Sequence, residues 1–292
     1  MTIKAFIDLA VERLEHLYPV QEAKALAVRL LKESVDGYKG YEHLVEPGTP
    51  LQGVAEETLL KVLERLASGE PLQYILGYEI FYGYRFNVAP GVLIPRPETE
   101  ELVKLVVGEK SEGKPRILDI CTGSGCIAWS LAAQLPQAEV YGCDISMDAL
   151  SIAQSQDMGD AKVTFFECDI LSPEALEKIS RGCGEEKFDA VVSNPPYVCE
   201  CEKSLMQKNV LDFEPSLALF VPDNDPLKFY SRIAELSGKL LKPGGSLYFE
   251  INERFGEETK KILQSRGFVD CRILQDLYGK DRMVCGITPK EL

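Results

Sequence analysis

Apolar residues in the N-terminal part of the chain recur at the three- and four-residue spacing that is typical of amphipathic helices. The same part contains no run with the alternation or the β-branched content of a strand. Its apolar positions form three groups, namely Phe6, Leu9, Ala10 and Leu14, then Ala25, Leu26, Leu30 and Leu31, then Leu59, Leu60, Leu63 and Leu66. We therefore predict a small helical domain over residues 1–70.

The pattern changes over residues 71–97, which read PLQYILGYEIFYGYRFNVAPGVLIPRP. Aromatic and β-branched residues are typical of strands, and the glycines and prolines between them are typical of turns. We predict that this segment is a β-hairpin connector. Acidic residues followed by an apolar stripe then predict a helix that begins near Thr99.

Beyond Lys114, short apolar runs alternate with helical stretches. The apolar runs are RILDI, AEVYGCD, KVTFFECD, FDAVVSN, GSLYFEI, FVDCRILQD and RMVCGI. Such alternation indicates a parallel sheet covered on both faces by helices. The last two runs, near 269–274 and 282–287, have no helix between them, so these strands should pair antiparallel. Residues 98–292 are thus predicted to form an α/β domain with a seven-stranded, mostly parallel sheet.

The balance of charge bears on the partner. The chain carries 32 lysines and arginines against 46 aspartates and glutamates, a formal charge of -14. Such a field repels phosphate backbones, which proteins usually bind with lysine and arginine clusters. Nucleic acid is therefore a disfavoured partner. The acidity itself is explained equally well by solubility and by attraction of a basic partner.

Cysteine, histidine and hydropathy narrow the class of protein further. The nine cysteines are odd in number and include no Cys-x-x-Cys pair, which favours a reducing cytoplasm over disulfides. No stretch is long enough to span a membrane, so no membrane partner is expected. The only histidines, His16 and His43, lie far apart, which argues against zinc or triad chemistry and predicts no metal site. Four cysteines lie on apolar runs and are expected to be buried: Cys121, Cys126, Cys143 and Cys168.

A glycine-rich turn follows the strand at 116–120 and opens a helix. Glycines there let the backbone approach a ligand closely, although similar turns also serve as plain connections. The next strand ends at Asp144, nineteen residues after Gly125, where a carboxylate can accept hydrogen bonds from both ribose hydroxyls of a nucleoside cofactor. The residues of the turn are Cys121, Thr122, Gly123, Ser124 and Gly125.

The third strand ends in an acid and an aliphatic residue, Asp169 and Ile170. The acid can accept a bond from an exocyclic adenine amine while Ile170 packs on the ring, although Asp169 taken alone is equally typical of a turn cap. Together with Asp144, these residues predict a nucleoside cofactor. An NAD-dependent oxidoreductase remains the alternative from a different chemical class.

The fourth strand is followed at once by Asn194, Pro195, Pro196 and Tyr197, at the edge where open α/β sheets bind ligands. An amide nitrogen is a poor nucleophile because its lone pair is delocalised into the carbonyl group. The side-chain oxygen of Asn194 and the main-chain carbonyl of Pro195 are fixed acceptors for the two N–H bonds of a target amide. Tyr197 is expected to stack on the planar amide. This loop predicts methyl transfer to an amide nitrogen.

At these residues the chain resembles the HemK/PrmC family, the protein-(glutamine-N5) methyltransferases that modify class 1 peptide chain release factors. The resemblance covers nearly the whole chain. Its motifs are EPLQYILG and IPRPETEELV in the connector, LDICTGSGCIA at the cofactor turn, VSNPPYV at the catalytic loop, and then FEPSLAL, LKPGG and DLYGKDRMV. Adenine-N6 DNA methyltransferases share Asn-Pro-Pro-Tyr, so the connector motifs make the resemblance specific.

The resemblance implies a Rossmann-like class I methyltransferase fold, S-adenosylmethionine as cofactor and S-adenosylhomocysteine as product. It implies that the acceptor is the glutamine of the Gly-Gly-Gln motif of release factors, held by residues 194–197, and that the enzyme acts on translation termination in the cytoplasm. It also implies that the helical domain docks the protein substrate. By the same resemblance Asp144 binds the ribose, residues 121–125, Ile170 and Asn194 line the cofactor pocket, and residues 96–99 border its entrance.

Two alternatives stay open at this point. An adenine-N6 nucleic-acid methyltransferase would use the same acceptor geometry on a flipped base, but it should have a basic groove, which the acidic composition opposes. A catalytically silent binding module would have no reason to keep Asn194 and Tyr197 beside an intact cofactor turn. The chain departs from many relatives at residues 221–227, VPDNDPL, so the shape of that loop is not predicted.

Overall fold

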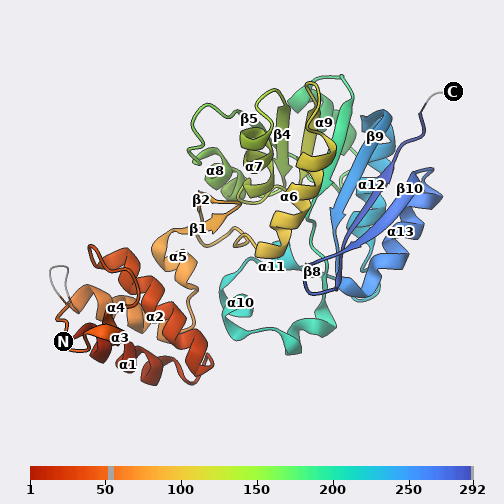
Figure 1. Ribbon diagram of the computed structural model, residues 1–292. Coiled ribbons are helices and arrows are strands. Elements are labelled where there is room, and N and C mark those ends of the chain that lie inside the picture. Colours follow the sequence, from red (N-terminus) through yellow and green to blue (C-terminus); the bar gives the residue numbers. More distant parts are fainter. Residues whose placement is uncertain (52–55, 291–292) are drawn as a thin grey trace. The chain divides into compact units, whose positions relative to one another are not determined.

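The computed structural model describes residues 1–51 and 56–290. The chain divides into two compact units (Figure 1). One comprises Met1–Gly77 together with Gln207–Phe213, and the other comprises Tyr78–Met206 together with Glu214–Leu292. Each unit has its own buried core.

The first unit is helical, as the apolar spacing predicts. Its helices pack their apolar faces together around fully buried side chains such as Phe6, Leu30 and Leu66. The hydroxyl of Thr2 accepts a hydrogen bond from the amide of Ala5 and so caps the first helix. The helices are α1 (Ile3–Leu14), α2 (Val20–Ser34), α3 (Glu42–Val45), α4 (Glu56–Ala67), α5 (Leu72–Leu76) and α10 (Lys208–Phe213).

The hairpin begins later than the sequence pattern predicts. Leu72–Leu76 form the short helix α5, which ends at Gly77 with a left-handed φ of 80°. Leu72 is 2% exposed and belongs to the core of the helical unit, so burial of this side chain outweighs the strand preference of its neighbours. The hairpin itself consists of β1 (Tyr78–Phe81) and β2 (Tyr84–Asn87), which pair antiparallel.

A seven-stranded sheet forms the centre of the second unit (Figure 1). The strand order is β10-β11-β9-β6-β3-β4-β5, and β11 runs antiparallel to both of its neighbours, β10 and β9, while the pairs from β9 to β5 are parallel. The mostly parallel sheet and the antiparallel pairing of the last two strands are therefore confirmed. The strands are β3 (Arg116–Ile120), β4 (Glu139–Asp144), β5 (Val163–Glu167), β6 (Phe188–Ser193), β9 (Leu241–Glu250), β10 (Val269–Gln275) and β11 (Asp281–Ile287).

Two apolar cores lie on the sheet. One contains residues of α6 and α7 with the hairpin side chains Phe81 and Phe86, and the other contains residues of α9, α12 and α13. Two shorter strands, β7 (Val198–Cys199) and β8 (Phe220–Val221), pair parallel outside the main sheet. The helices of this unit are α6 (Pro97–Glu109), α7 (Cys126–Gln134), α8 (Met147–Gln154), α9 (Ala175–Cys183), α11 (Ser216–Leu219), α12 (Lys228–Leu240) and α13 (Gly256–Ser265), with the 3-10 turns η1 (Glu200–Leu205) and η2 (Glu253–Phe255).

The strand order reverses at β3, which has β4 on one side and β6 on the other. In open α/β sheets a ligand binds beyond the carboxyl ends of the strands at such a reversal. The loops that follow β3, β4, β5 and β6 all meet at this edge. No helix in the described part of the chain is long and apolar enough to cross a membrane.

Candidate active site

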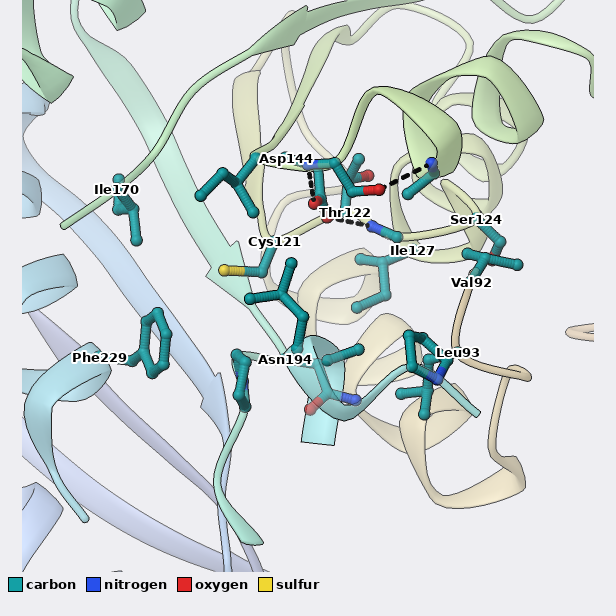
Figure 2. A pocket seen from close by; sticks show the side chains of 18 of the residues that line it. Val92, Leu93, Cys121, Thr122, Ser124, Ile127, Asp144, Ile170, Asn194 and Phe229 are labelled. Carbon is teal, nitrogen blue, oxygen red and sulfur yellow. Dashed lines mark hydrogen bonds between the residues drawn. The ribbon is translucent and has the colours of Figure 1, made fainter. Parts of the chain in front are cut away.

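A cavity of about 430 Å³ lies at this edge of the sheet (Figure 2). Such a volume falls within the range of pockets that hold small molecules and cofactors. Its wall combines residues that the sequence predicts with others that it does not. The predicted residues in the wall are Cys121, Thr122, Gly123, Ser124, Asp144, Asp169, Ile170, Asn194 and Pro196, while Gly125, Pro195 and Tyr197 stand outside it.

The turn after β3 has an unusual backbone. Cys121, Gly123 and Gly125 all have positive φ angles, of 62°, 55° and 78°. The amide of Thr122 donates to the carbonyl of Cys143 on β4, at 3.0 Å, which fixes the turn to the sheet. Cys121 is partly exposed toward the cavity, so the expectation that it is buried is wrong, whereas the burial of the other three cysteines is confirmed. Cys121 has this left-handed backbone although it is not glycine, and it lines the cavity.

Gly125 is the N-cap residue of α7 and is closely packed against residues outside the turn. A Cβ atom at this position would lie 3.0 Å from carbon atoms of Phe165 and Trp129. The helix and β5 therefore approach the turn so closely that glycine alone fits without a shift.

Asp144 ends β4 beside the cavity (Figure 2). Its Oδ2 atom accepts a hydrogen bond from the amide of Gly123 and its Oδ1 atom accepts one from the amide of Ser146, both at 2.9 Å. Burial raises the pKa of this carboxyl above its ordinary value, and the two backbone donors oppose the shift. Each oxygen has a second lone pair, so the carboxylate can still accept bonds from a ligand.

A second acid, Asp119, supports the turn and was missed by the sequence reasoning. Asp119 is fully buried in β3, and its Oδ2 atom accepts a hydrogen bond from the hydroxyl of Thr122 at 2.6 Å. Burial raises the pKa of the Asp119 carboxyl to about 7. The polar residue inside the otherwise apolar run RILDI was the available signal.

Asp169 and Ile170 follow β5 and line the cavity. Ile170 is 4% exposed and offers an apolar surface. The Oδ1 atom of Asp169 accepts a hydrogen bond from the amide of Leu171, two residues on, at 2.9 Å. Asp169 therefore caps a turn and faces the cavity at once, so the two interpretations of this residue are compatible.

The loop after β6 places Asn194 in the wall of the cavity (Figure 2). Pro196 also lines the cavity. The side-chain nitrogen of Asn194 donates to the hydroxyl of Thr99 at 3.3 Å. Tyr197 is partly exposed beside this loop but does not line the cavity, and its hydroxyl donates to Glu250 at 3.2 Å. Burial and the neighbouring Glu250 raise the pKa of the Tyr197 hydroxyl, which keeps it protonated as a donor.

One wall of the cavity comes from residues 91–96 and 215–218. An ion pair joins these segments, because Arg96 binds Glu214 at 2.5 Å and Glu214 also accepts the amide of Ile94 at 3.1 Å. Arg96 and Thr99 line the cavity. Further wall residues that were not predicted are Val92, Leu93, Ile127, Ile145, Leu217 and Phe229.

These features suit a nucleoside cofactor. The cavity joins a carboxylate at the end of β4, a turn with positive φ angles and aliphatic side chains after β4 and β5. Acceptors for ribose hydroxyls and apolar surfaces for a base are thus available in one place. Among residues 1–51 and 56–290, no three histidine, cysteine, aspartate or glutamate side chains gather in a way that could hold a metal ion.

Comparison with known proteins identifies the class. Residues 99–212 match the family model of the methyltransferase small domain, and residues 6–77 match that of the PrmC N-terminal domain. A crystal structure of a methyltransferase from Pyrococcus furiosus has the same fold, with a TM-score of 0.51 and 15% identity over 72% of this chain and 91% of that chain. The fold and the family model together define an S-adenosylmethionine-dependent methyltransferase.

The relatives are more specific. A release factor glutamine methyltransferase from Bacteroides thetaiotaomicron is 46% identical over 94% of this chain and 95% of its own length. One from Flavobacterium psychrophilum is 41% identical over 97% of this chain and 98% of its own length. The chain belongs to the release factor glutamine methyltransferase family. The resemblance drawn from the motifs is confirmed, and membership of a methyltransferase family removes the NAD-dependent oxidoreductase.

Proposed function

We propose that this enzyme transfers the methyl group of S-adenosylmethionine to the side-chain amide nitrogen of the glutamine in the Gly-Gly-Gln motif of class 1 peptide chain release factors. The observation that carries the proposal is the orientation of Asn194. Its nitrogen donates to Thr99, which leaves its oxygen available as an acceptor at the cavity wall. A primary amide that is to be methylated offers N–H donors, so an acceptor is the group it requires.

The loop would hold the acceptor glutamine by its two N–H bonds. In this proposal the oxygen of Asn194 accepts one bond and the main-chain carbonyl of Pro195 accepts the other. Pro195 and Pro196 restrict the backbone of the loop, so these acceptors lose little freedom when the substrate binds. The ring of Tyr197, held at its hydroxyl by Glu250, stacks on the planar amide.

The cofactor, when bound, supplies an electrophilic methyl group on a sulfonium centre. We assign its ribose to Asp144, its adenine to Asp169 and Ile170, and its remaining contacts to Cys121, Thr122, Gly123, Ser124, Gly125 and Asn194. The methylated amide loses its proton to water, so the loop needs no strong general base. The chemistry of these donors and acceptors supports the assignment, and no metal is part of it.

The partner is proposed to be the release factor protein, with neither nucleic acid nor membrane as a substrate, and the place of action the cytoplasm. The formal charge of -14 opposes binding of a phosphate backbone. We propose that residues 1–70 dock the release factor and that residues 98–292 carry out the transfer. Residues 71–97 connect these two domains. Family membership along nearly the whole chain supports this division of labour.

The acceptor class is tested by offering methyl-labelled S-adenosylmethionine with a class 1 release factor and, separately, with duplex DNA. Label should enter the release factor and not the DNA. A release factor whose Gly-Gly-Gln glutamine is replaced by alanine is the control and should stay unlabelled. Label on DNA adenine alone would contradict the proposal and favour the adenine-N6 alternative, which shares the Asn-Pro-Pro-Tyr loop.

Replacing Asn194 with alanine should lower kcat at least about a hundredfold, the effect of removing one hydrogen-bonding group that orients a reacting atom. The dissociation constant of S-adenosylmethionine, measured by calorimetry, should rise by less than about fivefold, because one bond to the cofactor is worth little more than that. Full activity of the Asn194→Ala variant would contradict the acceptor role of this side chain.

A further inference from the structure

Three polar side chains from distant parts of the sequence meet beneath the catalytic loop. Thr99 lies in the first turn of α6 and is 2% exposed, and Glu250 ends β9 and is 1% exposed. Asn194 directly follows β6. Because β6 and β9 pair in parallel with Ser193 opposite Phe249, Asn194 and Glu250 leave the same edge of the sheet side by side.

The direction of each hydrogen bond follows from the chemistry of the groups. The Oγ1 atom of Thr99 lies 2.6 Å from the Oε2 atom of Glu250, and the hydroxyl of Tyr197 donates to Oε1 at 3.2 Å. In the ionised form of Glu250 both carboxylate oxygens act as acceptors. The hydroxyl of Thr99 has a single hydrogen, and the bond to Glu250 uses it.

Thr99 can consequently face Asn194 only as an acceptor. The side-chain nitrogen of Asn194 lies 3.3 Å from this hydroxyl oxygen, which is the arrangement that the chemistry requires. An Asn194 side chain rotated by half a turn would bring its oxygen against the lone pairs of Thr99. The same rotation would present N–H donors to the acceptor glutamine, which itself offers donors, so no productive bond would form.

We propose that Thr99 and Glu250 are positioning residues that hold the Asn194 amide in the one orientation with its oxygen turned to the substrate, an inference that rests on the proposed acceptor role of Asn194. Glu250 stands outside the cavity wall and acts through Thr99. Thr99 belongs to the segment IPRPETEELV and Glu250 to the segment GSLYFEI. Both segments thereby orient the Asn194 side chain, although neither supplies an acceptor to the substrate.

The inference is tested first with Thr99→Val, which keeps the shape of the side chain and removes the hydroxyl. The kcat for release factor methylation should fall about tenfold, the effect of losing one orienting hydrogen bond, while the dissociation constant of S-adenosylmethionine should change less than about threefold. Thr99→Ser restores the hydroxyl and should recover most of the kcat.

Thr259 offers a matched control. It is fully buried in α13 of the same unit, and its hydroxyl has no hydrogen-bond partner among the described residues. Thr259→Val makes the same chemical change away from the site and should leave kcat as in the wild type. A kcat for Thr99→Val equal to that for Thr259→Val would overturn the inference.

Glu250→Gln is an independent variant that keeps the shape of the carboxylate. Its amide can donate to Thr99, which frees Thr99 to donate toward Asn194 and favours the unproductive orientation. The kcat should again fall about tenfold or more, with little change in the binding of S-adenosylmethionine. Wild-type kcat in Glu250→Gln would contradict the role of Glu250 even if Thr99→Val proved unstable.

A readout without substrate separates this inference from the proposed function. In protein labelled with nitrogen-15 asparagine, the side-chain NH₂ signal of Asn194, assigned by its loss in Asn194→Ala, should shift and exchange faster with water in Thr99→Val and in Glu250→Gln. An unchanged signal would overturn the inference whatever the activity. A wild-type enzyme that leaves the glutamine unmethylated while these signals change as expected would instead contradict the proposed function.

Discussion

At the scale of single residues, buried acids determine how the site responds to its surroundings. Asp119 lies within β3, while Asp144 and Glu250 end β4 and β9, and burial raises the pKa of each of these carboxyls. In each case hydrogen-bond donors stabilise the charged form and oppose this rise in pKa. Asp119 differs from the others because its Oδ1 atom is buried with no partner among the described residues. Its protonation should therefore influence stability most directly.

The stability of the enzyme should fall as the pH rises toward neutrality because of Asp119. Its pKa in the folded protein is about 7, above the ordinary value of 3.8, so the folded state binds the proton more tightly than the unfolded state. This contribution is fully present below the ordinary pKa and is lost as the pH rises through about 7. Between about pH 5 and pH 8 the change is on the order of 2–3 kcal/mol.

Urea unfolding at several pH values checks this expectation. The side chain of the Asp119→Asn variant cannot ionise, so its free energy of unfolding should depend less on pH over this window. Asp157→Asn, which changes an exposed aspartate in the same way, should retain the wild-type slope. If the wild type and Asp119→Asn had the same slope, the carboxyl of Asp119 would not be the group responsible.

Residue patterns predicted the acceptors and the cofactor turn because these depend on local order: Asn194 follows its strand directly, and residues 121–125 follow theirs. Residue patterns could not predict which distant side chains support these residues. Thr99 and Glu250 are 151 positions apart in the sequence, and their hydrogen bond exists only because α6 and β9 come together in the fold. The exposure of Cys121 likewise depends on a left-handed backbone that no residue-type preference indicates.

At the scale of elements, the cofactor turn is constrained by close packing between α7 and β5. Gly125→Ala adds a Cβ atom at 3.0 Å from Phe165 and Trp129 on a backbone with φ of 78°. The left-handed conformation alone costs about 1–2 kcal/mol for alanine, and the crowding adds about 1–3 kcal/mol. The free energy of unfolding should fall by the sum, and S-adenosylmethionine should bind more weakly because the turn must shift.

A variant at Gly113 separates the cost of the left-handed backbone from the cost of crowding. Gly113 has nearly the same φ, 77°, but an added Cβ would meet no atom within 4 Å. Gly113→Ala should therefore show the conformational cost alone, with unchanged binding of S-adenosylmethionine by calorimetry. Equal losses of stability in the two variants would show that packing against the turn is unimportant.

The ion pair between Arg96 and Glu214 joins two segments of the cavity wall. The side chain of Glu214 is 2% exposed and that of Arg96 is 33% exposed. Glu214→Gln should lower the free energy of unfolding by roughly 1–3 kcal/mol, the value of a charged hydrogen bond, and raise the dissociation constant of S-adenosylmethionine. Both changes are measurable by thermal unfolding and calorimetry.

A matched control is the exposed pair of Glu177 and Arg181 on α9, with side chains 61% and 76% exposed. Glu177→Gln should change stability by less than about 0.5 kcal/mol, because water screens such pairs. If Glu214→Gln had as small an effect, the buried pair would not be what holds the wall together.

The order of elements was largely predictable, because each strand of the main sheet follows the apolar runs closely. Helix α5 was not, since the short segment LQYIL fits either a strand or a helix until its neighbours are known. The segment is helical in the structure, where Leu72 is buried in the core of the helical unit. The Arg96–Glu214 pair was also beyond reach of the sequence, because its partners belong to two loops.

At the scale of the whole molecule, the chain passes twice through the helical unit. Gln207–Phe213 belong to that unit, although the residues on either side of them belong to the sheet unit. Within the helical unit, Asn209 of α10 donates to the hydroxyl of Tyr18 at 3.4 Å. The chain that follows the catalytic loop is thus part of the unit proposed to dock the release factor, which the sequence alone did not predict.

The central claim concerns one atom of the substrate, so its most direct test locates the methyl group. A class 1 release factor is incubated with the enzyme and S-adenosylmethionine, and the peptide that contains the Gly-Gly-Gln motif is fragmented in a mass spectrometer. The account predicts one added methyl group on the side-chain amide of that glutamine, absent with Asn194→Ala. A methyl group on any other residue, with this glutamine unmodified, would contradict it.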